Sequence, residues 1–168
     1  MKQKILNESG MRIPYHPELC YMIEKSAIVG KLQGVKIVEF VEANETDQII
    51  MLEAKTTSPQ PGNKNDYDEY LSSVREKFQN SVSLLNAAKL KRLPTIYNEL
   101  PQALKDVDYK DAVYKLYFVI KQSKSDWITN LSADLYRQLR PFLTCWNIPK
   151  NNFIVVNEEM ARNLRIVE

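Results

Sequence analysis

Apolar residues recur at helical spacing in three stretches of the chain. The longest stripe predicts a helix over residues 67–90. It consists of Tyr67, Tyr70, Leu71, Val74, Phe78, Val82 and Leu85. Shorter stripes predict helices over residues 17–26 and 130–146, and Pro141 is expected to kink or end the later of these two helices.

Between these stretches the pattern is typical of β-strands. Residues 29–43 and 48–57 are rich in β-branched side chains and predict the two arms of a hairpin. Turn-forming residues at 44–47 would connect the arms. Residues 112–122 and 151–156 are nearly continuous in apolarity, which predicts strands that are covered on both faces.

Prolines and capping residues mark where the predicted elements end. Pro94 and Pro101 bracket a connection that is expected to be irregular. Asn157 is a good N-cap residue, and it predicts a short final helix that begins at Glu158. The order of the elements predicts the α/β fold class, with a mixed sheet that has helices on both faces.

The bulk properties are those of a single globular domain. The chain has 168 residues, of which 44% are apolar and 26% are charged. We therefore expect one domain over residues 1–168, with residues 1–14 as a candidate flexible arm. No apolar stretch approaches the roughly 20 residues that span a bilayer, and the N-terminal residues lack the apolar core of a secretory signal. The sequence thus predicts a cytoplasmic protein without a membrane partner.

The composition argues against two common chemistries. His16 is the only histidine, and no G-x-S-x-G motif accompanies it, so a serine or cysteine nucleophile with a histidine base is not indicated. The four glycines form neither a phosphate loop nor a dinucleotide-binding motif. Acidic residues gather between Glu18 and Glu53, and basic residues gather over 64–92 and 110–140. A metal-dependent enzyme acting on a polyanion needs such a distribution, although chance also produces it.

One apolar strand carries charged residues that suggest a specific chemistry. Glu53 and Lys55 lie two positions apart, so both side chains project from one face of the strand. Glu39 lies on the other arm of the hairpin, where pairing could bring it beside Glu53. These two carboxylates and the Ala54 carbonyl would form an all-oxygen site suited to Mg²⁺ or Mn²⁺, beside a lysine that can position an attacking water. The alternative is a solvent-facing ion pair that contributes little to stability.

These residues and the element order resemble the PD-(D/E)XK nuclease superfamily, which has the restriction-endonuclease-like fold. The resemblance covers roughly residues 15–157, and its E-x-K motif is Glu53-Ala54-Lys55. It implies a three-layer α/β/α core with a central mixed sheet in αβββαβ order. It also implies that Glu39 is the first acid of the site, with Glu42, on the opposite face of the strand, as the alternative. The family usually has an aspartate after a proline there, whereas Val38 precedes Glu39 in this chain.

The resemblance also implies a function. It predicts a Mg²⁺-dependent or Mn²⁺-dependent endonuclease that cleaves DNA, with RNA left open as a substrate, and Glu24 as an auxiliary acid. The protein would act as a homodimer or as the nuclease subunit of a restriction, phage-defence or repair assembly. Arg75 and Gln79 are candidate phosphate contacts, and Ser83 replaces the tyrosine found four residues after this glutamine in some exonuclease branches. The alternative is a catalytically inactive nuclease-like subunit that binds nucleic acid or scaffolds a complex.

Overall fold

A five-stranded mixed sheet forms the centre of the protein in the computed structural model, which describes residues 2–44 and 47–168. The strands are β1 (Lys4–Glu8), β2 (Met11–Tyr15), β3 (Cys20–Tyr21), β4 (Phe40–Ala43), β5 (Gln48–Thr57), β6 (Val113–Gln122) and β7 (Phe153–Asn157). The central sheet has the order β3-β4-β5-β6-β7, and β1 and β2 form a separate antiparallel hairpin. The pairs β3–β4 and β4–β5 are antiparallel, whereas β5–β6 and β6–β7 are parallel.

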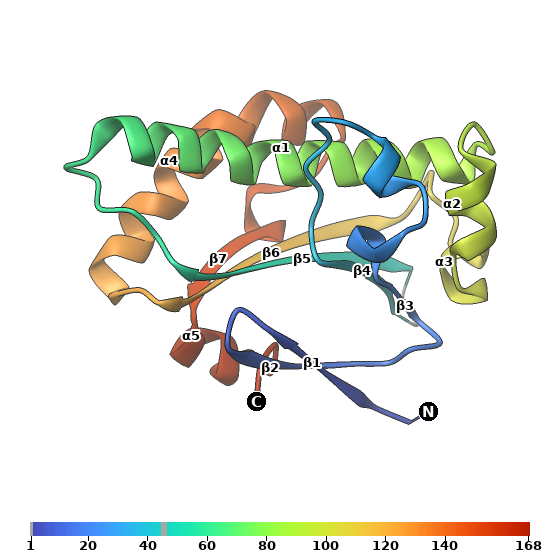
Figure 1. The fold of residues 1–168 in the computed structure, drawn as a ribbon, viewed down its shortest axis with the longest axis horizontal. Coiled ribbons are helices and arrows are strands. Elements are labelled where there is room, and N and C mark those ends of the chain that lie inside the picture. Colours follow the sequence, from blue (N-terminus) through green and yellow to red (C-terminus); the bar gives the residue numbers. More distant parts are fainter. Residues whose placement is uncertain (1, 45–46) are drawn as a thin grey trace.

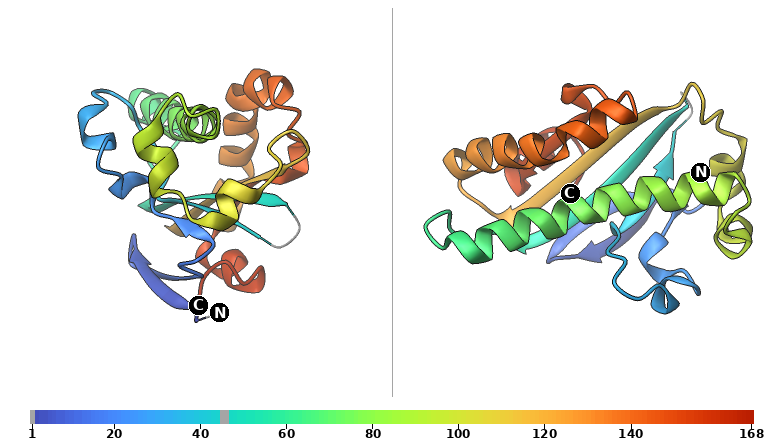
Figure 2. Two further views of the ribbon diagram at one scale, coloured as in Figure 1. Left: turned by 90° about the vertical axis from the view of Figure 1, so that its right-hand side faces the viewer. Right: turned by 90° about the horizontal axis from the view of Figure 1, so that it is seen from above.

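Helices and the separate hairpin cover the two faces of this sheet. The helices are α1 (Lys64–Lys89), α2 (Pro94–Glu99), α3 (Gln102–Asp106), α4 (Ser125–Cys145) and α5 (Glu158–Asn163). Figure 1 shows α1 and α4 on one face, and α5 with the β1–β2 hairpin on the other. Figure 2 shows α1 and α4 side by side across the sheet. The α/β class and the mixed sheet are therefore confirmed, although the layer opposite α1 and α4 consists largely of the hairpin.

Alternating residues of β5 enter two separate cores. Ile49 and Met51 belong to the larger core, which lies between the sheet and α1 and α4. Leu52 and Ala54 belong to a smaller core, which the hairpin and α5 close. Because both faces are covered, the strand is apolar without strict alternation. The charged residues that follow Leu52 consequently enter a largely buried environment.

The long helical stripe is confirmed. The structure places α1 at Lys64–Lys89, and the residues predicted for its apolar face pack into the larger core. The hairpin is confirmed in part, with Phe40 opposite Leu52 and β5 over the predicted residues 48–57. The first arm, predicted over residues 29–43, is a strand only at Phe40–Ala43, and a 3-10 turn forms at Val29–Lys31 instead. Glu45 and Thr46, in the turn predicted at residues 44–47, lie outside the described residues.

The helix predicted over residues 17–26 is wrong. Cys20 and Tyr21 instead form β3, and a single 3-10 turn follows at Ile23–Lys25. A ten-residue segment forms an isolated helix poorly, whereas pairing with β4 satisfies the backbone and buries Tyr21. The expected order αβββαβ therefore does not begin with an α-helix.

Two further expectations about prolines need correction. The connection bracketed by Pro94 and Pro101 is helical, because Pro94 occupies the first turn of α2 and Pro101 is the N-cap of α3. Proline suits the start of a helix, since its missing N–H has no partner there in any case. Pro141 does not end α4, which continues to Cys145. The short helix capped by Asn157 is confirmed as α5.

The segment expected as a flexible arm, residues 1–14, contains β1 and most of β2. Its two strands are joined by Ser9 and Gly10, which both have positive φ. This geometry is typical of a two-residue hairpin turn. Met11 and Ile13 bury their side chains in the smaller core and so fix the hairpin against the sheet. Among the described residues, no helix is both long and apolar enough to cross a membrane.

Candidate active site

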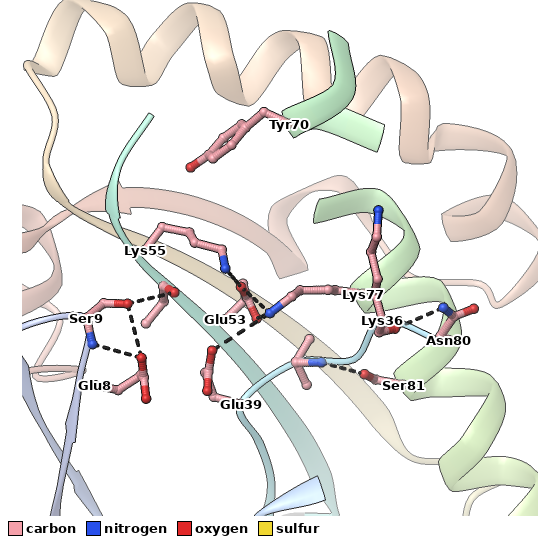
Figure 3. A network of polar contacts seen from close by, with 12 residues as sticks. Glu8, Ser9, Lys36, Glu39, Glu53, Lys55, Tyr70, Lys77, Asn80 and Ser81 are labelled. Carbon is pink, nitrogen blue, oxygen red and sulfur yellow. Dashed lines mark hydrogen bonds and ion pairs between the residues drawn. The ribbon is translucent and has the colours of Figure 1, made fainter. Parts of the chain in front are cut away.

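The predicted acids and lysine come together where the β4–β5 ladder ends (Figure 3). Glu53 and Lys55 project from β5 toward α1, on the same face as Met51. Glu39 directly precedes β4, and its backbone N–H donates a 3.1 Å hydrogen bond to the Leu52 carbonyl. The β4–β5 hairpin therefore places Glu39 beside Glu53, as the sequence predicts.

Helix α1 fixes the segment that carries Glu39. The Ser81 hydroxyl accepts a 2.9 Å hydrogen bond from the Val38 N–H, and the Asn80 amide donates a 2.9 Å bond to the Lys36 carbonyl. Both contacts hold an irregular backbone that lacks a strand partner at this point. The position of Glu39 thus depends on α1 as well as on the hairpin.

A second lysine, which the sequence did not indicate, lies between the two acids. The Lys77 Nζ is 2.7 Å from Glu53 Oε1 and 2.9 Å from Glu53 Oε2. It is also 3.8 Å from Glu39 Oε1. The Lys77 side chain is 11% exposed and that of Glu53 is 0% exposed, so these charges interact with little solvent screening. Lys77 therefore compensates the buried Glu53 carboxylate.

Lys55 contacts the same carboxylate from the solvent side. Its Nζ lies 3.2 Å from Glu53 Oε1, and its side chain is 37% exposed. Burial alone would lower the pKa of Lys55, but the charge and hydrogen bond of Glu53 outweigh burial, and the pKa is raised. Lys55 is consequently an ammonium donor at neutral pH and does not act as a free base.

Burial and neighbouring carboxylates change the proton affinity of both acids. Burial raises the pKa of Glu39 to about 8, with further contributions from a hydrogen bond to Glu24 and from the charge of Glu53, while Lys77 opposes the shift. Glu39 is therefore largely protonated at neutral pH. Burial also raises the pKa of Glu53, against the opposing charges of Lys77 and Lys55.

Glu24 thus stands next to the site despite the failure of the predicted helix. It lies in the 3-10 turn Ile23–Lys25, and its side chain is exposed. It is close enough to Glu39 to raise the pKa of that acid. The structure accordingly brings together Glu24, Glu39, Glu53 and Lys55, the four residues predicted as catalytic.

The Ala54 carbonyl completes the predicted set of oxygen donors. Carbonyls two residues apart on a strand point the same way, so Ala54 O points toward β4, as Leu52 O does. β4 begins only at Phe40, opposite Leu52, and the ladder does not reach Ala54. The Ser9 hydroxyl donates a 3.1 Å hydrogen bond to Ala54 O, and Ser9 in turn donates to Glu8 Oε1. The tip of the β1–β2 hairpin therefore closes this side of the site.

The donors fit a hard divalent cation in their chemistry. Glu39, Glu53 and Ala54 offer only oxygen atoms, which Mg²⁺ and Mn²⁺ prefer. Glu53 Oε1 is buried, and although both lysines pair with it, it accepts no hydrogen bond of regular geometry. In residues 2–44 and 47–168, however, no cluster of three acidic, histidine or cysteine side chains is arranged to hold a metal. A cation here would rely on two carboxylates, the carbonyl and water.

The structure does not bring the two predicted phosphate contacts to the acids. Arg75 and Gln79 each lie two residues from Lys77, about 200° away around the axis of α1. Arg75 instead donates a 3.0 Å hydrogen bond to the Ser72 hydroxyl. The signal for Lys77 was its helical spacing from Tyr70 and Val74, which places it on the face of α1 that looks toward the sheet.

An open groove gives access to Lys55. Its volume is about 480 Å³. It is lined by Lys36, Lys55, Pro59, Asp66, Glu69, Tyr70 and Ser73. The Tyr70 hydroxyl donates a 3.2 Å hydrogen bond to the Thr57 carbonyl, and burial together with the Glu53 charge raises the pKa of Tyr70. The groove carries both signs of charge, and Lys55 connects it to the acids through its contact with Glu53.

Comparisons of the chain with protein-family models, with curated proteins and with solved structures found no match.

Proposed function

We propose that the protein is a metal-dependent nuclease with a restriction-endonuclease-like core that cleaves phosphodiester bonds in DNA. The observation that carries this proposal is the convergence of Glu39, Glu53 and Lys55 beside the Ala54 carbonyl, at the open end of the β4–β5 ladder. Burying these two acids side by side is costly, because Glu39 is held largely protonated and Glu53 needs the charge of Lys77. Catalysis gives a physical reason to keep such an arrangement.

Each residue has a distinct role in this proposal. Glu39, Glu53 and the Ala54 carbonyl would hold Mg²⁺ or Mn²⁺, and Glu39 would lose its proton on binding because only the carboxylate is a good ligand. The bound ion would supply Lewis-acid stabilisation of phosphoryl charge and lower the pKa of a coordinated water. Glu24 would serve as an auxiliary acid through its contact with Glu39.

Lys55 would position the attacking water. Its raised pKa keeps the side chain as an ammonium, which can orient a water or stabilise a phosphate oxygen but cannot accept a proton from either. Its partial exposure and its place on the groove allow a phosphodiester to reach it from solvent. This combination distinguishes Lys55 from the more deeply buried Lys77.

We further propose that two copies act together, or that the chain is the nuclease subunit of a larger assembly. The described residues build one α/β unit with one acidic site, and a pair of such sites would cut both strands of a duplex in one encounter. Restriction, phage defence and repair are settings that the resemblance suggests. These biological settings are inferred only from the resemblance in fold.

A second candidate function is a nuclease-like subunit that binds nucleic acid or scaffolds a complex without catalysis. The observation in its favour is Lys77, whose ammonium already compensates Glu53 and contacts Glu39. With an internal cation in place, the charge network is stable without any metal. Under this alternative, Glu53 and Lys55 serve stability alone.

The experiment that separates the two candidates is cleavage of supercoiled plasmid and of single-stranded DNA with Mg²⁺, Mn²⁺ or EDTA. The variant is Lys55→Ala, and the matched control is Lys110→Ala, an exposed lysine that precedes β6 at the opposite end of the sheet. Metal-dependent cutting that is lost only in Lys55→Ala supports the nuclease. Absence of cutting, together with absence of metal-induced thermal stabilisation, favours the non-catalytic subunit.

A further inference from the structure

We propose that Lys77 is an internal competitor for the metal, so that its ammonium sets how tightly the acidic site binds a divalent cation. This inference rests on the proposed function, and it concerns the regulation of the same site. It assigns Lys77 a role opposite to that of Lys55: Lys55 would assist the reaction, whereas Lys77 would restrain loading of the cation.

The contacts of Lys77 place its charge against the proposed ligands themselves. The Nζ atom is within 2.9 Å of both Glu53 oxygens and 3.8 Å from Glu39 Oε1, so it lies between the carboxyl group on β5 and the one that directly precedes β4. Lys55 reaches only one oxygen of Glu53, at 3.2 Å. Because an ammonium and a metal ion need the same lone pairs, Lys77 and the cation cannot both hold Glu53 in this way.

Electrostatics adds to this steric competition. Lys77 is largely buried, and the repulsion between a divalent cation and an ammonium a few ångströms away is strong where water screens poorly. Lys77 has a flexible four-carbon stem, and this lets the ammonium turn along α1 toward solvent. Binding of the metal would therefore include displacement of Lys77, and the observed affinity would be reduced by the strength of the Lys77–Glu53 contact.

The fold also explains why Lys77 holds this position. Tyr70, Val74, Lys77 and Ser81 follow one another along the face of α1 that looks toward the sheet. Val74 and Ser81 are buried on either side of Lys77, and Ser81 also anchors the Glu39 segment through Val38. The lysine is thus carried by the element that also positions one of the ligands, and if it moved away Glu53 would keep only Lys55 as a charged partner.

The test is calorimetric titration of Mn²⁺ into the full chain, comparing wild type with Lys77→Met. Methionine keeps the apolar stem and removes the charge. We expect the dissociation constant to fall by at least about tenfold, which corresponds to roughly 1.4 kcal/mol. The matched control is Lys36→Met, which removes a nearby cation that pairs with Glu76 and touches neither proposed ligand. We expect this control to change the affinity much less.

The outcomes separate this inference from the proposed function. If wild type binds Mn²⁺ and Lys77→Met binds it equally or more weakly, competition is refuted while the metal site stands. If neither protein binds Mn²⁺, the inference and the metal-dependent function both fail. If Lys36→Met tightens binding as much as Lys77→Met, the effect is general electrostatics, and the specific role of Lys77 is refuted.

A measurement on wild type covers the case in which Lys77→Met does not fold. Lysine side-chain ¹⁵N resonances can be recorded with EDTA and with Mg²⁺, which is diamagnetic. A buried, paired ammonium exchanges its protons slowly, so Lys77 is expected to give an observable signal that saturating Mg²⁺ shifts or removes. Binding of Mg²⁺ with an unchanged Lys77 signal would overturn the inference.

Discussion

At the scale of single residues, the buried carboxylate of Glu53 requires neighbouring groups of opposite charge. Its side chain has no exposed surface, and an isolated carboxylate in such a place would cost several kcal/mol by usual estimates. Lys77 and Lys55 supply opposite charge from α1 and from β5 itself. The network therefore depends on its cations much more than an exposed ion pair would.

This dependence leads to a prediction for Lys77. Lys77→Met leaves Glu53 buried with only the half-exposed Lys55 as its partner, so we expect it to lower the free energy of unfolding by roughly 3 kcal/mol without metal. Adding Glu53→Gln removes the poorly compensated charge. The double variant should therefore lose less free energy of unfolding than the sum of the losses in the two single variants. Chemical denaturation of the four proteins measures the coupling.

The control for this cycle is the exposed pair of Arg137 and Asp134, whose atoms are 3.0 Å apart on α4. Arg137→Met is expected to change stability by less than about 1 kcal/mol, because water screens this pair. If Lys77→Met and Arg137→Met lowered the free energy of unfolding equally, the buried network would contribute no more to stability than an exposed ion pair.

A different carboxylate, Glu42, gives a prediction about pH. It lies on β4 next to the smaller core, and burial raises its pKa, with the His16 backbone N–H opposing the shift through a 3.3 Å bond. A carboxylic acid with a raised pKa in the folded state lowers the free energy of unfolding as the pH rises above the pKa that the group has in the unfolded chain. For glutamate this unfolded-state pKa is about 4.3. The stability advantage of Glu42→Gln over wild type should therefore increase from pH 4 toward neutral pH.

Thermal melts of wild type and Glu42→Gln across that pH range test whether the stability advantage of the variant increases with pH. The same substitution at Glu69, an exposed residue of α1, serves as the control for the loss of one negative charge. A stability difference between wild type and Glu42→Gln that stays constant with pH would contradict the assignment of Glu42 as a partly buried carboxylate with a raised pKa.

At the scale of elements, the β1–β2 hairpin places its tip on the candidate site. Ser9 donates to the Ala54 carbonyl, and the Lys121 ammonium donates a 2.6 Å hydrogen bond to the Gly10 carbonyl. The tip is thus held by β5 and by β6 at the same time. Any change to its turn geometry should affect both the stability of the hairpin and the surroundings of Ala54.

Gly10→Ala tests this arrangement. Gly10 has a φ of +72°, and an added Cβ would lie 2.8 Å from Lys121 Nζ. We expect a loss of roughly 1–2 kcal/mol from the left-handed backbone, with some further loss from displacement of Lys121. Gly30→Ala is the matched control, because nothing lies within 4 Å of the added Cβ and φ is not positive. Equal melting temperatures for the two variants would refute the proposed role of the turn.

The comparison of sequence with structure also belongs to this scale. The apolar stripe of α1 and the apolar run of β5 are readable in the sequence, because each depends on a pattern within one element. β3 was misread as helix because its two residues become a strand only by pairing with β4. The hairpin was missed although Ser9-Gly10 is a turn signal, since its strands are short and carry a proline at Pro14.

At the scale of the whole molecule, the residues of the candidate site also divide into those placed by one element or hairpin and those placed by packing between distant elements. Glu53 and Lys55 could be predicted because two residues of one strand share a face, and Glu39 followed from a hairpin closed over a few residues. Lys77 could not be placed, because its contact with Glu53 depends on how α1 crosses the sheet. The contact of Ser9 with Ala54 spans 45 residues and depends on docking of the hairpin.

The C-terminal end of the described chain packs against the β1–β2 hairpin, and this contact gives the last prediction. The Glu168 N–H donates a 2.9 Å hydrogen bond to the Arg12 carbonyl, and Val167 is buried in the smaller core with Met11 and Ile13. If this layer folds together with the sheet, Val167→Ala should remove buried apolar surface and lower the stability of the whole molecule by roughly 1–3 kcal/mol.

Arg12→Ala is the control for this experiment. It breaks an ion pair with Glu168 whose two side chains are exposed, so the expected change is under about 1 kcal/mol. Denaturation should be followed by far-ultraviolet circular dichroism and by tryptophan fluorescence. Trp127 and Trp146, at the two ends of α4, report on the opposite face of the sheet. Coincident shifts of both signals in Val167→Ala would mean that one cooperative unit spans both faces, because a change in the smaller core is then felt at α4. A shift in one signal alone would mean that the hairpin layer unfolds separately, and Ser9 would then leave the Ala54 carbonyl before the acidic site is lost.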